Sequence, residues 1–170
     1  MSGLLARLEA VELADASVAH IELWLSDQPV EEESVFAAMV VVGDAAGRFV
    51  AVYSPRREEW GSPGGWRERG ESVVECALRE VAEETGLRLA PGELRPVGFE
   101  RFEPVSAGGR WPAQGGALQL FRAVVAGAGG DLHASESDAV APAWVTADQF
   151  AALAGGRFWW PLVAHVLQGA

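Results

Sequence analysis

The chain has 170 residues and a formal net charge of −11, from 24 acidic and 13 basic side chains. This length suits one well-packed domain and is short for two. The acidic balance argues against binding to nucleic-acid polymers, which needs basic patches, but it allows a small phosphorylated ligand. The single cysteine excludes an intrachain disulfide, and no apolar run is long enough to span a membrane, so we expect a cytoplasmic protein.

Residues 1–34 are predicted to form an N-terminal extension before a main domain at residues 35–170. Three leucines near the start are spaced for a short helical turn: Leu4, Leu5 and Leu8. Residues 20–25 alternate between polar and apolar side chains, which predicts a strand. The following residues, 26–34, are polar and contain a proline, so they are predicted to form a connector.

Two apolar β-rich runs follow, at residues 36–42 and 49–53, and a turn with glycine at both ends joins them. This pattern predicts a β-hairpin. Three consecutive valines at residues 40–42 predict a strand that is covered on both faces. A charged loop at residues 56–59 then precedes a glycine turn.

The segment from Ser72 to Gly86 is predicted to be a capped helix. Ser72 and Glu75 match a capping box, and Gly86 stands where a left-handed residue would end the helix. At about 100° per residue, one side of the helix forms a packing stripe of small and apolar side chains. The stripe consists of Val74, Ala77, Leu78, Val81, Ala82 and Thr85, and the opposite side carries Cys76, Glu80, Glu83 and Glu84.

Glu80, Glu83 and Glu84 place three carboxylates on adjacent turns of this helix. Like charges at this spacing repel one another, so a bound cation would stabilise them. Ligands that are all oxygen select hard ions, which predicts Mg²⁺, with Mn²⁺ as a substitute. The alternative is a solvated acidic helix face, which is the commoner fate of a run of charges.

The residues around the glutamates favour the metal site. From Gly65 to Leu87 the chain has every fixed position of the pattern GX5EX7REUXEEXGU, including the aliphatic positions at Val81 and Leu87. This is the signature of the Nudix hydrolases, which the chain therefore resembles. The flanking pattern extends the resemblance to roughly residues 35–155.

The resemblance implies an α+β fold, the Nudix-type α/β/α sandwich with a mixed β-sheet. It also implies Mg²⁺-dependent hydrolysis of a phosphoanhydride bond in a nucleoside diphosphate linked to another moiety. A nucleoside triphosphate, including an oxidised one, and ADP-ribose are the leading substrates. The alternative is a catalytically silent nucleotide-binding module, which the intact glutamates disfavour. N-terminal strands help some such proteins to dimerise, so a homodimer and an extra edge strand both remain open for residues 20–25.

By the same resemblance, Glu80, Glu83 and Glu84 are the metal ligands. Arg79 would orient them through ion pairs, and its spacing from Glu75 and Glu83, four residues away on either side, supports this role. A carboxylate outside the motif is a further candidate for the general base. The candidates are Glu136 first, then Glu100 and Glu103.

The expected substrate contacts lie in two loops. Gly64 and Gly65 allow a diphosphate to approach the main chain. Arg67 is predicted either to contact phosphates or to face solvent. Trp111, in the loop at residues 104–116, is predicted either to stack on a base or to cover the rim of the sheet. Cys76 is expected to pack or to line the site rather than to act as a nucleophile.

The rest of the chain alternates between short predicted elements. Strands are expected at residues 94–102, 117–125 and 143–145, and helices at residues 146–153 and 159–167.

Overall fold

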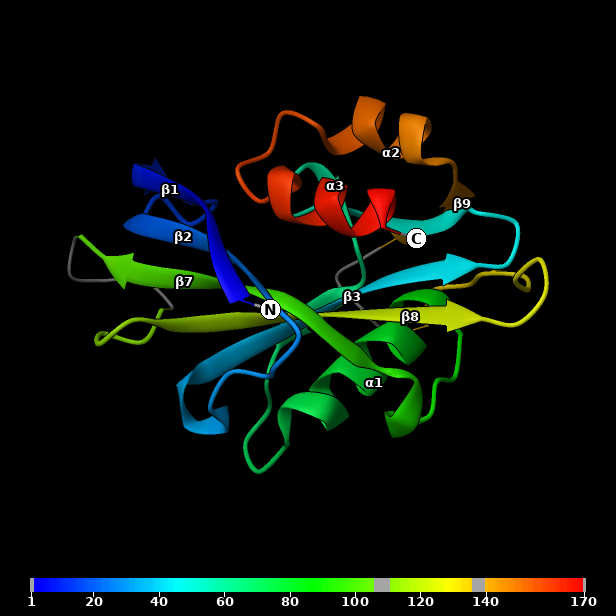
Figure 1. Cartoon of the computed structure of the whole chain (residues 1–170), viewed down its shortest axis with the longest axis horizontal. Coiled ribbons are helices and arrows are strands. Elements are labelled where there is room, and N and C mark those ends of the chain that lie inside the picture. Colours follow the sequence, from blue (N-terminus) through cyan, green and yellow to red (C-terminus); the bar gives the residue numbers. More distant parts are fainter. Residues whose placement is uncertain (1, 106–110, 136–139, 170) are drawn as a thin grey trace.

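The computed structural model describes residues 2–105, 111–135 and 140–169. Nine strands in this part of the chain form one mixed sheet, and α-helices cover both of its faces (Figure 1). Helix α1 (Val73–Thr85) packs on one face, while α2 (Ala147–Ala154) and α3 (Trp160–Gln168) pack on the other. This confirms the predicted α+β fold, a mixed sheet between helices.

The strands are β1 (Ser2–Glu12), β2 (Val18–Ser26), β3 (Val35–Asp44), β4 (Phe49–Ser54), β5 (Glu59–Gly61), β6 (Gly64–Trp66), β7 (Arg95–Pro104), β8 (Gly116–Val125) and β9 (Val140–Val145). Their order in the sheet is β1-β2-β7-β8-β3-β4-β5, with β6 beside β3 and β9 beside β4. The β3–β8 pair is parallel and the other pairs are antiparallel. Two 3-10 turns lie at Glu32–Ser34 and Pro91–Glu93.

The N-terminal leucines lie in strand β1, so the predicted helical turn is wrong. β1 pairs with β2, and β2 pairs with β7. The ladder satisfies the backbone groups of this segment and so overrides the local spacing of the leucines. The strand predicted at residues 20–25 is confirmed within β2, where Ile21 and Leu23 are fully buried. The division of the chain at residue 34 stays a prediction.

The predicted hairpin is formed only beside its turn. β3 and β4 pair at Gly43 and Phe49, and β4 then continues beside β5 and β9 while β6 lies against β3. The valines of β3 are covered on both faces, as predicted. Val41 packs in the core under α2 and α3, whereas Val40 and Val42 pack in the core under α1.

The predicted helix ends are confirmed. Ser72 and Glu75 form the capping box of α1, and Gly86 ends the helix with a positive φ of 75°. A second capping box, made by Thr146 and Gln149, starts α2. The final helix begins at Trp160, one residue later than predicted, and Trp159 at its N-cap position is a buried core residue whose side chain makes no capping hydrogen bond. No helix in the described ranges is both long and apolar enough to cross a membrane.

Candidate active site

Strand β6 brings two glycines against β3 at the start of the motif. Gly64 lies opposite Met39, and Gly65 lies opposite Ala38. A Cβ on Gly64 would stand 2.5 Å from the Ala38 carbonyl oxygen, and one on Gly65 would stand 2.6 Å from the Glu80 Cδ atom. Gly64 therefore requires glycine because backbone atoms lie against it, whereas a side chain at Gly65 would displace the end of the Glu80 carboxylate.

The acidic side of α1 is more buried than its sequence pattern predicts. Glu80 is 9% exposed and Glu84 is 5% exposed, and Cys76 is fully buried on the same side. These side chains lie against β6, which the hydrophobic pattern of the helix alone does not reveal. Val74, Leu78 and Ala82, which were expected in the packing stripe, are only half-buried.

Arg79 connects the motif carboxylates. Its Nε and Nη2 atoms donate to both oxygens of Glu71, at 2.7 and 3.0 Å, and Nη1 donates to Glu80 Oε1 at 2.7 Å and to Glu83 Oε2 at 3.2 Å. The hydrogen bonds from Arg79 are the main reason that the pKa of Glu71 is lowered. The expected pair with Glu83 is present. The expected pair with Glu75 is wrong, because the Glu75 carboxylate accepts from the Ser72 backbone N–H in the capping box.

Glu84 faces the glycine turn. Its Oε2 atom accepts a hydrogen bond from the Gly64 N–H at 3.0 Å. Burial raises the pKa of Glu84 to about 8, and the negative charges of Glu80 and Glu83 add to this rise. Burial also raises the pKa of Glu80. The three carboxylates therefore form a crowded anionic site, and a bound cation would offset the repulsion between their charges.

The motif glutamates have the donor chemistry of a magnesium site. No group of three or more His, Cys, Asp or Glu side chains in the described residues is arranged around a common metal position. Each glutamate nevertheless keeps one oxygen that no hydrogen bond from the described residues reaches: Glu80 Oε2, Glu83 Oε1 and Glu84 Oε1. These residues fit a hard cation once their side chains turn toward it.

Cys76 packs inside the motif as expected. Its thiol donates to the Gly65 carbonyl oxygen at 3.5 Å. Burial raises the pKa of Cys76 to about 12, so the thiol stays protonated at neutral pH. The side chain supports the glycine turn and is a poor nucleophile.

Arg67 forms a clamp between the motif loop and the 3-10 turn at Glu32–Ser34. Nε and Nη2 donate to the Glu71 carbonyl, Nη1 donates to the Glu32 and Val35 carbonyls, and Nη2 also donates to the Glu32 carboxylate. These five hydrogen bonds engage the whole guanidinium. A phosphate contact by Arg67 stays a prediction, and it would require one of these bonds to be exchanged.

The clamp predicts a loss of stability when Arg67 is removed. We expect Arg67→Ala to lower the free energy of unfolding by roughly 2–3 kcal/mol, because several backbone carbonyls lose charge-assisted hydrogen bonds. Urea unfolding measures this change. Arg69→Ala is the matched control, because Arg69 is exposed in the same loop. Equal stability of the two variants would contradict the claim that the hydrogen bonds of Arg67 stabilise the fold.

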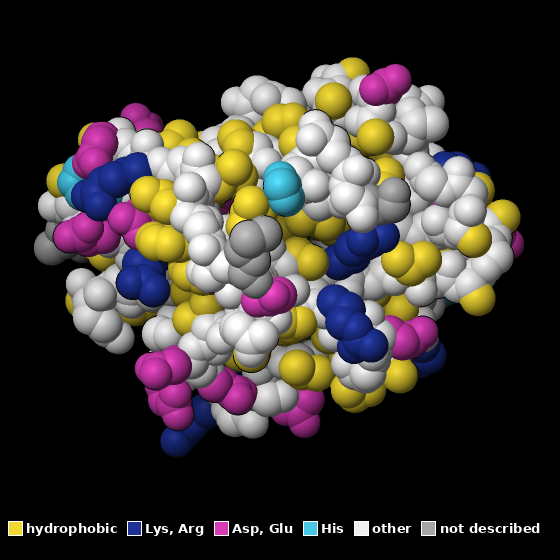
Figure 2. All heavy atoms as spheres, in the orientation of Figure 1, with side chains coloured by type: hydrophobic (Ala, Val, Ile, Leu, Met, Phe, Trp, Pro, Cys, Tyr) yellow, Lys and Arg dark blue, Asp and Glu magenta, His cyan; other side chains and the backbone are white. Residues whose placement is uncertain are grey.

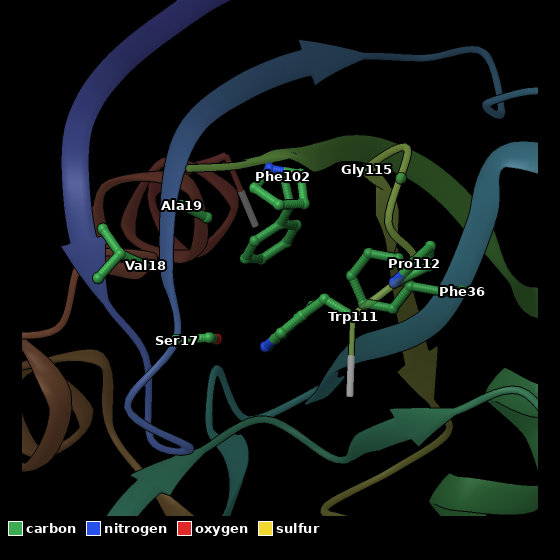
Figure 3. Close-up of a pocket in the computed structure, with 10 residues that line it drawn as sticks. Ser17, Val18, Ala19, Phe36, Phe102, Trp111, Pro112 and Gly115 are labelled. Carbon is green, nitrogen blue, oxygen red and sulfur yellow. The ribbon is translucent and has the colours of Figure 1, made fainter. Parts of the chain in front are cut away.

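Trp111 lies in an aromatic cluster at one end of the sheet. Its ring stacks on Phe102 with centroids 4.8 Å apart, and it packs on Phe36 and Trp66 at 5.1 Å each. In Figure 3 its side chain extends toward Ser17, and its Nε1 atom is buried without a hydrogen-bond partner in the described structure. The hollow beside it is about 10 Å³, too small for a nucleobase. Base stacking by Trp111 stays a prediction.

The three candidates for the general base differ in their position and in their exposure to solvent. Glu136 lies outside the described residues. Glu103 is exposed on β7, and Glu100 is buried on the same strand, 3% exposed.

The loop that leads to Glu136 is fixed to the end of the motif helix. The Ser135 N–H donates to the Glu83 carbonyl oxygen at 2.7 Å, and the His133 N–H donates to the Thr85 carbonyl oxygen at 3.0 Å. The His133 ring covers Gly86 so closely that a Cβ there would overlap it. The spacing pattern of the motif gave no sign of these contacts, which only the tertiary structure brings about.

Comparison with known proteins agrees with this architecture. The family model of the NUDIX domain matches residues 34–165, so the chain belongs to the Nudix family. A curated relative, the uncharacterized Nudix hydrolase YvcI of Bacillus subtilis (strain 168), is 40% identical over 50 residues. That match spans 29% of this chain and 32% of the relative.

Solved structures with the same fold are distant in sequence. The Bacillus subtilis pyrophosphohydrolase BsRppH has a TM-score of 0.59 at 20% identity, covering 83% of this chain and 77% of its own. The E. coli dihydroneopterin triphosphate pyrophosphohydrolase has a TM-score of 0.60 at 21% identity, covering 83% and 99%. A C. elegans Ap4A hydrolase has a TM-score of 0.56 at 16% identity, covering 79% and 99%. At these sequence identities, the similarity shows a shared fold and no more.

Proposed function

We propose that this chain is a pyrophosphohydrolase that uses Mg²⁺, or Mn²⁺ as a substitute, to hydrolyse a phosphoanhydride bond in a nucleoside diphosphate linked to another moiety. One observation carries the proposal. Glu80, Glu83 and Glu84 each present a carboxylate oxygen without a hydrogen bond from the described residues, beside Gly64 and Gly65 of strand β6. Intact carboxylates at all three positions favour catalysis over a silent binding module.

The residues of the site divide the chemistry between them. A bound Mg²⁺ would neutralise charge on the diphosphate and acidify the attacking water. Gly64 and Gly65 keep side chains away from the place where the diphosphate lies. Arg79 holds Glu80 and Glu83 through its hydrogen bonds. Water then attacks phosphorus in line, and a phosphate-containing group leaves.

Glu136 is our choice for the general base. The hydrogen bond between the Ser135 N–H and the Glu83 carbonyl anchors the residue just before it on the motif helix. Glu103 is exposed and Glu100 is buried in an inner strand, which leaves both less suited to activating a water.

The substrate is proposed to be a nucleoside triphosphate, including an oxidised one, or an ADP-ribose-like compound. Two structural neighbours are named for a dihydroneopterin triphosphate and for Ap4A, which both contain a phosphate chain. On the face shown in Figure 2, basic side chains form separate small groups among acidic and apolar ones. The formal net charge of −11 supports a small nucleotide partner rather than a nucleic-acid polymer.

Cytoplasmic location and a homodimer remain predictions. The location rests on the single cysteine. The homodimer rests on the N-terminal strands, of which β1 is the outermost in the sheet.

A nucleotide panel tests the proposed reaction. With Mg²⁺ we expect release of phosphate or pyrophosphate from at least one nucleoside triphosphate, or cleavage of ADP-ribose. Chelation of the metal by EDTA should reduce this to the background rate, because the carboxylates alone cannot neutralise the diphosphate. No turnover across a broad panel, together with tight nucleotide binding, would favour the silent binding module.

A further inference from the structure

Glu32 lies outside the motif, in the 3-10 turn at Glu32–Ser34, and contacts the motif segment at two places. Its Oε1 atom accepts a hydrogen bond from the Val73 N–H at 3.1 Å and one from Arg67 Nη2 at 3.2 Å. The Glu32 carbonyl oxygen also accepts from Arg67 Nη1 at 2.7 Å. One residue of the connector therefore binds both the motif loop and the first residue of helix α1.

The Val73 N–H fixes the Glu32 carboxylate at the start of the motif helix. The first N–H groups of a helix have no partner within it, and the helix dipole favours a carboxylate near them. The capping box of α1 joins Ser72 and Glu75 to each other and leaves the Val73 N–H for Glu32. The carboxylate of Glu32 therefore has a fixed place, from which it also holds Arg67.

Arg67 connects Glu32 to Glu71. Its Nε and Nη2 atoms donate to the Glu71 carbonyl oxygen at 3.1 and 2.6 Å. The Glu71 carboxylate in turn accepts two hydrogen bonds from Arg79, at 2.7 and 3.0 Å. Arg67 therefore fixes the main chain of the residue whose side chain orients the guanidinium of Arg79.

Arg79 brings these contacts to the motif glutamates. Its Nη1 atom donates to Glu80 at 2.7 Å and to Glu83 at 3.2 Å. A continuous series of hydrogen bonds therefore runs from Glu32 to two of the proposed metal ligands. Residues that orient metal ligands in this way affect the affinity for the metal, although they do not bind it themselves.

The neighbouring residue in the same turn makes no such contact. Glu33 is exposed, and its side chain forms no hydrogen bond or ion pair with the described residues. The match to the NUDIX domain begins at residue 34, so Glu32 precedes it. The motif spacing does not reveal the role of Glu32, because Arg67 follows it 35 residues later in the sequence.

We propose that Glu32 is a positioning residue for the metal site and acts through Arg67. Held by Glu32, Arg67 keeps the motif loop in the shape that presents Arg79 to the metal ligands. The inference rests on the proposed function for the identity of those ligands. It adds to that function a contribution from the connector before the matched domain.

Binding of Mn²⁺ to the metal-free chain tests this role. Calorimetry should show that Glu32→Ala binds Mn²⁺ about threefold to fivefold more weakly, because two ligands are oriented less firmly. Glu32→Gln keeps an acceptor oxygen and should recover most of the affinity. Glu33→Ala is the matched control, since it removes the same charge from the same turn, and it should bind like the unmodified chain. Equal affinities of Glu32→Ala and Glu33→Ala would overturn the proposal.

A double variant tests whether Glu32 acts through Arg67. We expect Arg67→Ala to weaken Mn²⁺ binding by about tenfold. Adding Glu32→Ala should weaken it little further, because the carboxylate has lost the group that it holds. All measurements are made well below the melting temperature of each variant, so that folded chains are compared. Losses that multiply in the double variant would overturn the route through Arg67.

Steady-state kinetics separate this inference from the proposed reaction. Glu32→Ala should raise the Mg²⁺ concentration for half-maximal rate by about threefold to fivefold, while the KM for the nucleotide at saturating Mg²⁺ stays within about twofold. If Glu32→Ala weakens Mn²⁺ binding but the unmodified chain hydrolyses no nucleotide, the proposed reaction fails and the positioning role stands. If the unmodified chain hydrolyses nucleotides and Glu32→Ala binds Mn²⁺ equally well, the positioning role fails alone.

Discussion

Replacing Glu84 or Glu83 by Gln is expected to lower turnover by about a hundredfold or more, since each loses a charged metal ligand. Several kcal/mol of charge stabilisation depend on the metal, and about 3 kcal/mol corresponds to a hundredfold. Initial rates with saturating Mg²⁺ and the best nucleotide measure the loss. Glu75→Gln is the matched control on the same helix, because Glu75 only caps the first turn. Activity that persists in both variants would make the metal-site assignment wrong.

The Glu84→Gln substitution should leave the fold intact, because the amide oxygen that it introduces can still accept from the Gly64 N–H. The pKa of Glu84 in the folded chain, about 8, is above its ordinary value of 4.5. Its favourable contribution in the metal-free chain is therefore complete below pH 4.5 and lost as the pH rises through about 8.

We therefore expect metal-free Glu84→Gln to lose less stability than the unmodified chain as the pH rises from about 5 to about 9, since this carboxyl no longer titrates. Thermal melts across that range measure the difference. Parallel pH profiles for the two chains would contradict the raised pKa of Glu84.

The two adjacent glycines of the turn should give opposite results when each is replaced by alanine. Gly64→Ala forces a Cβ against the Ala38 carbonyl and the Met39 Cα, which are backbone atoms that cannot move away. We expect it to lower the free energy of unfolding by roughly 2–3 kcal/mol. Gly65→Ala meets the end of the Glu80 side chain, which can turn aside. It should keep most of the stability and lose turnover by about a hundredfold, because a metal ligand is displaced.

Urea unfolding and initial rates, measured on both variants, decide this prediction. Gly92→Ala is the control for the exchange of glycine for alanine itself, since a Cβ at Gly92 would meet no atom within 4 Å. Equal losses of stability in Gly64→Ala and Gly65→Ala would show that the Glu80 side chain cannot move. Unchanged turnover in Gly65→Ala would show that the position of Glu80 is not needed for the reaction.

Features that depend on neighbours in the sequence could be predicted well. The capping box of Ser72 and Glu75 and the left-handed Gly86 follow from local hydrogen bonding and backbone conformation, and both are present. The ion pair between Arg79 and Glu83 follows from helical spacing. The spacing could not show that Arg79 also binds Glu71, which lies before the helix and reaches it only through the fold of the loop.

Features that depend on pairing between distant segments could not be predicted from the sequence. The N-terminal leucines were predicted to form a helical turn, but pairing with β2 makes them part of a strand. β3 and β4 pair only beside their turn and separate away from it, where β3 pairs with β6 and β4 pairs with β9. Local periodicity contains no information about these partners, and they decide the strand order.

The amino-acid sequence by itself determined the family, the helix that carries the glutamates and the type of bond that we propose is cleaved. It did so because the motif is contiguous and its roles follow from helical geometry. Only the tertiary structure decided that Glu84 is buried against Gly64 and that Arg67 clamps a loop. These relations join segments far apart in the chain, and burial and charge act through space rather than along the sequence.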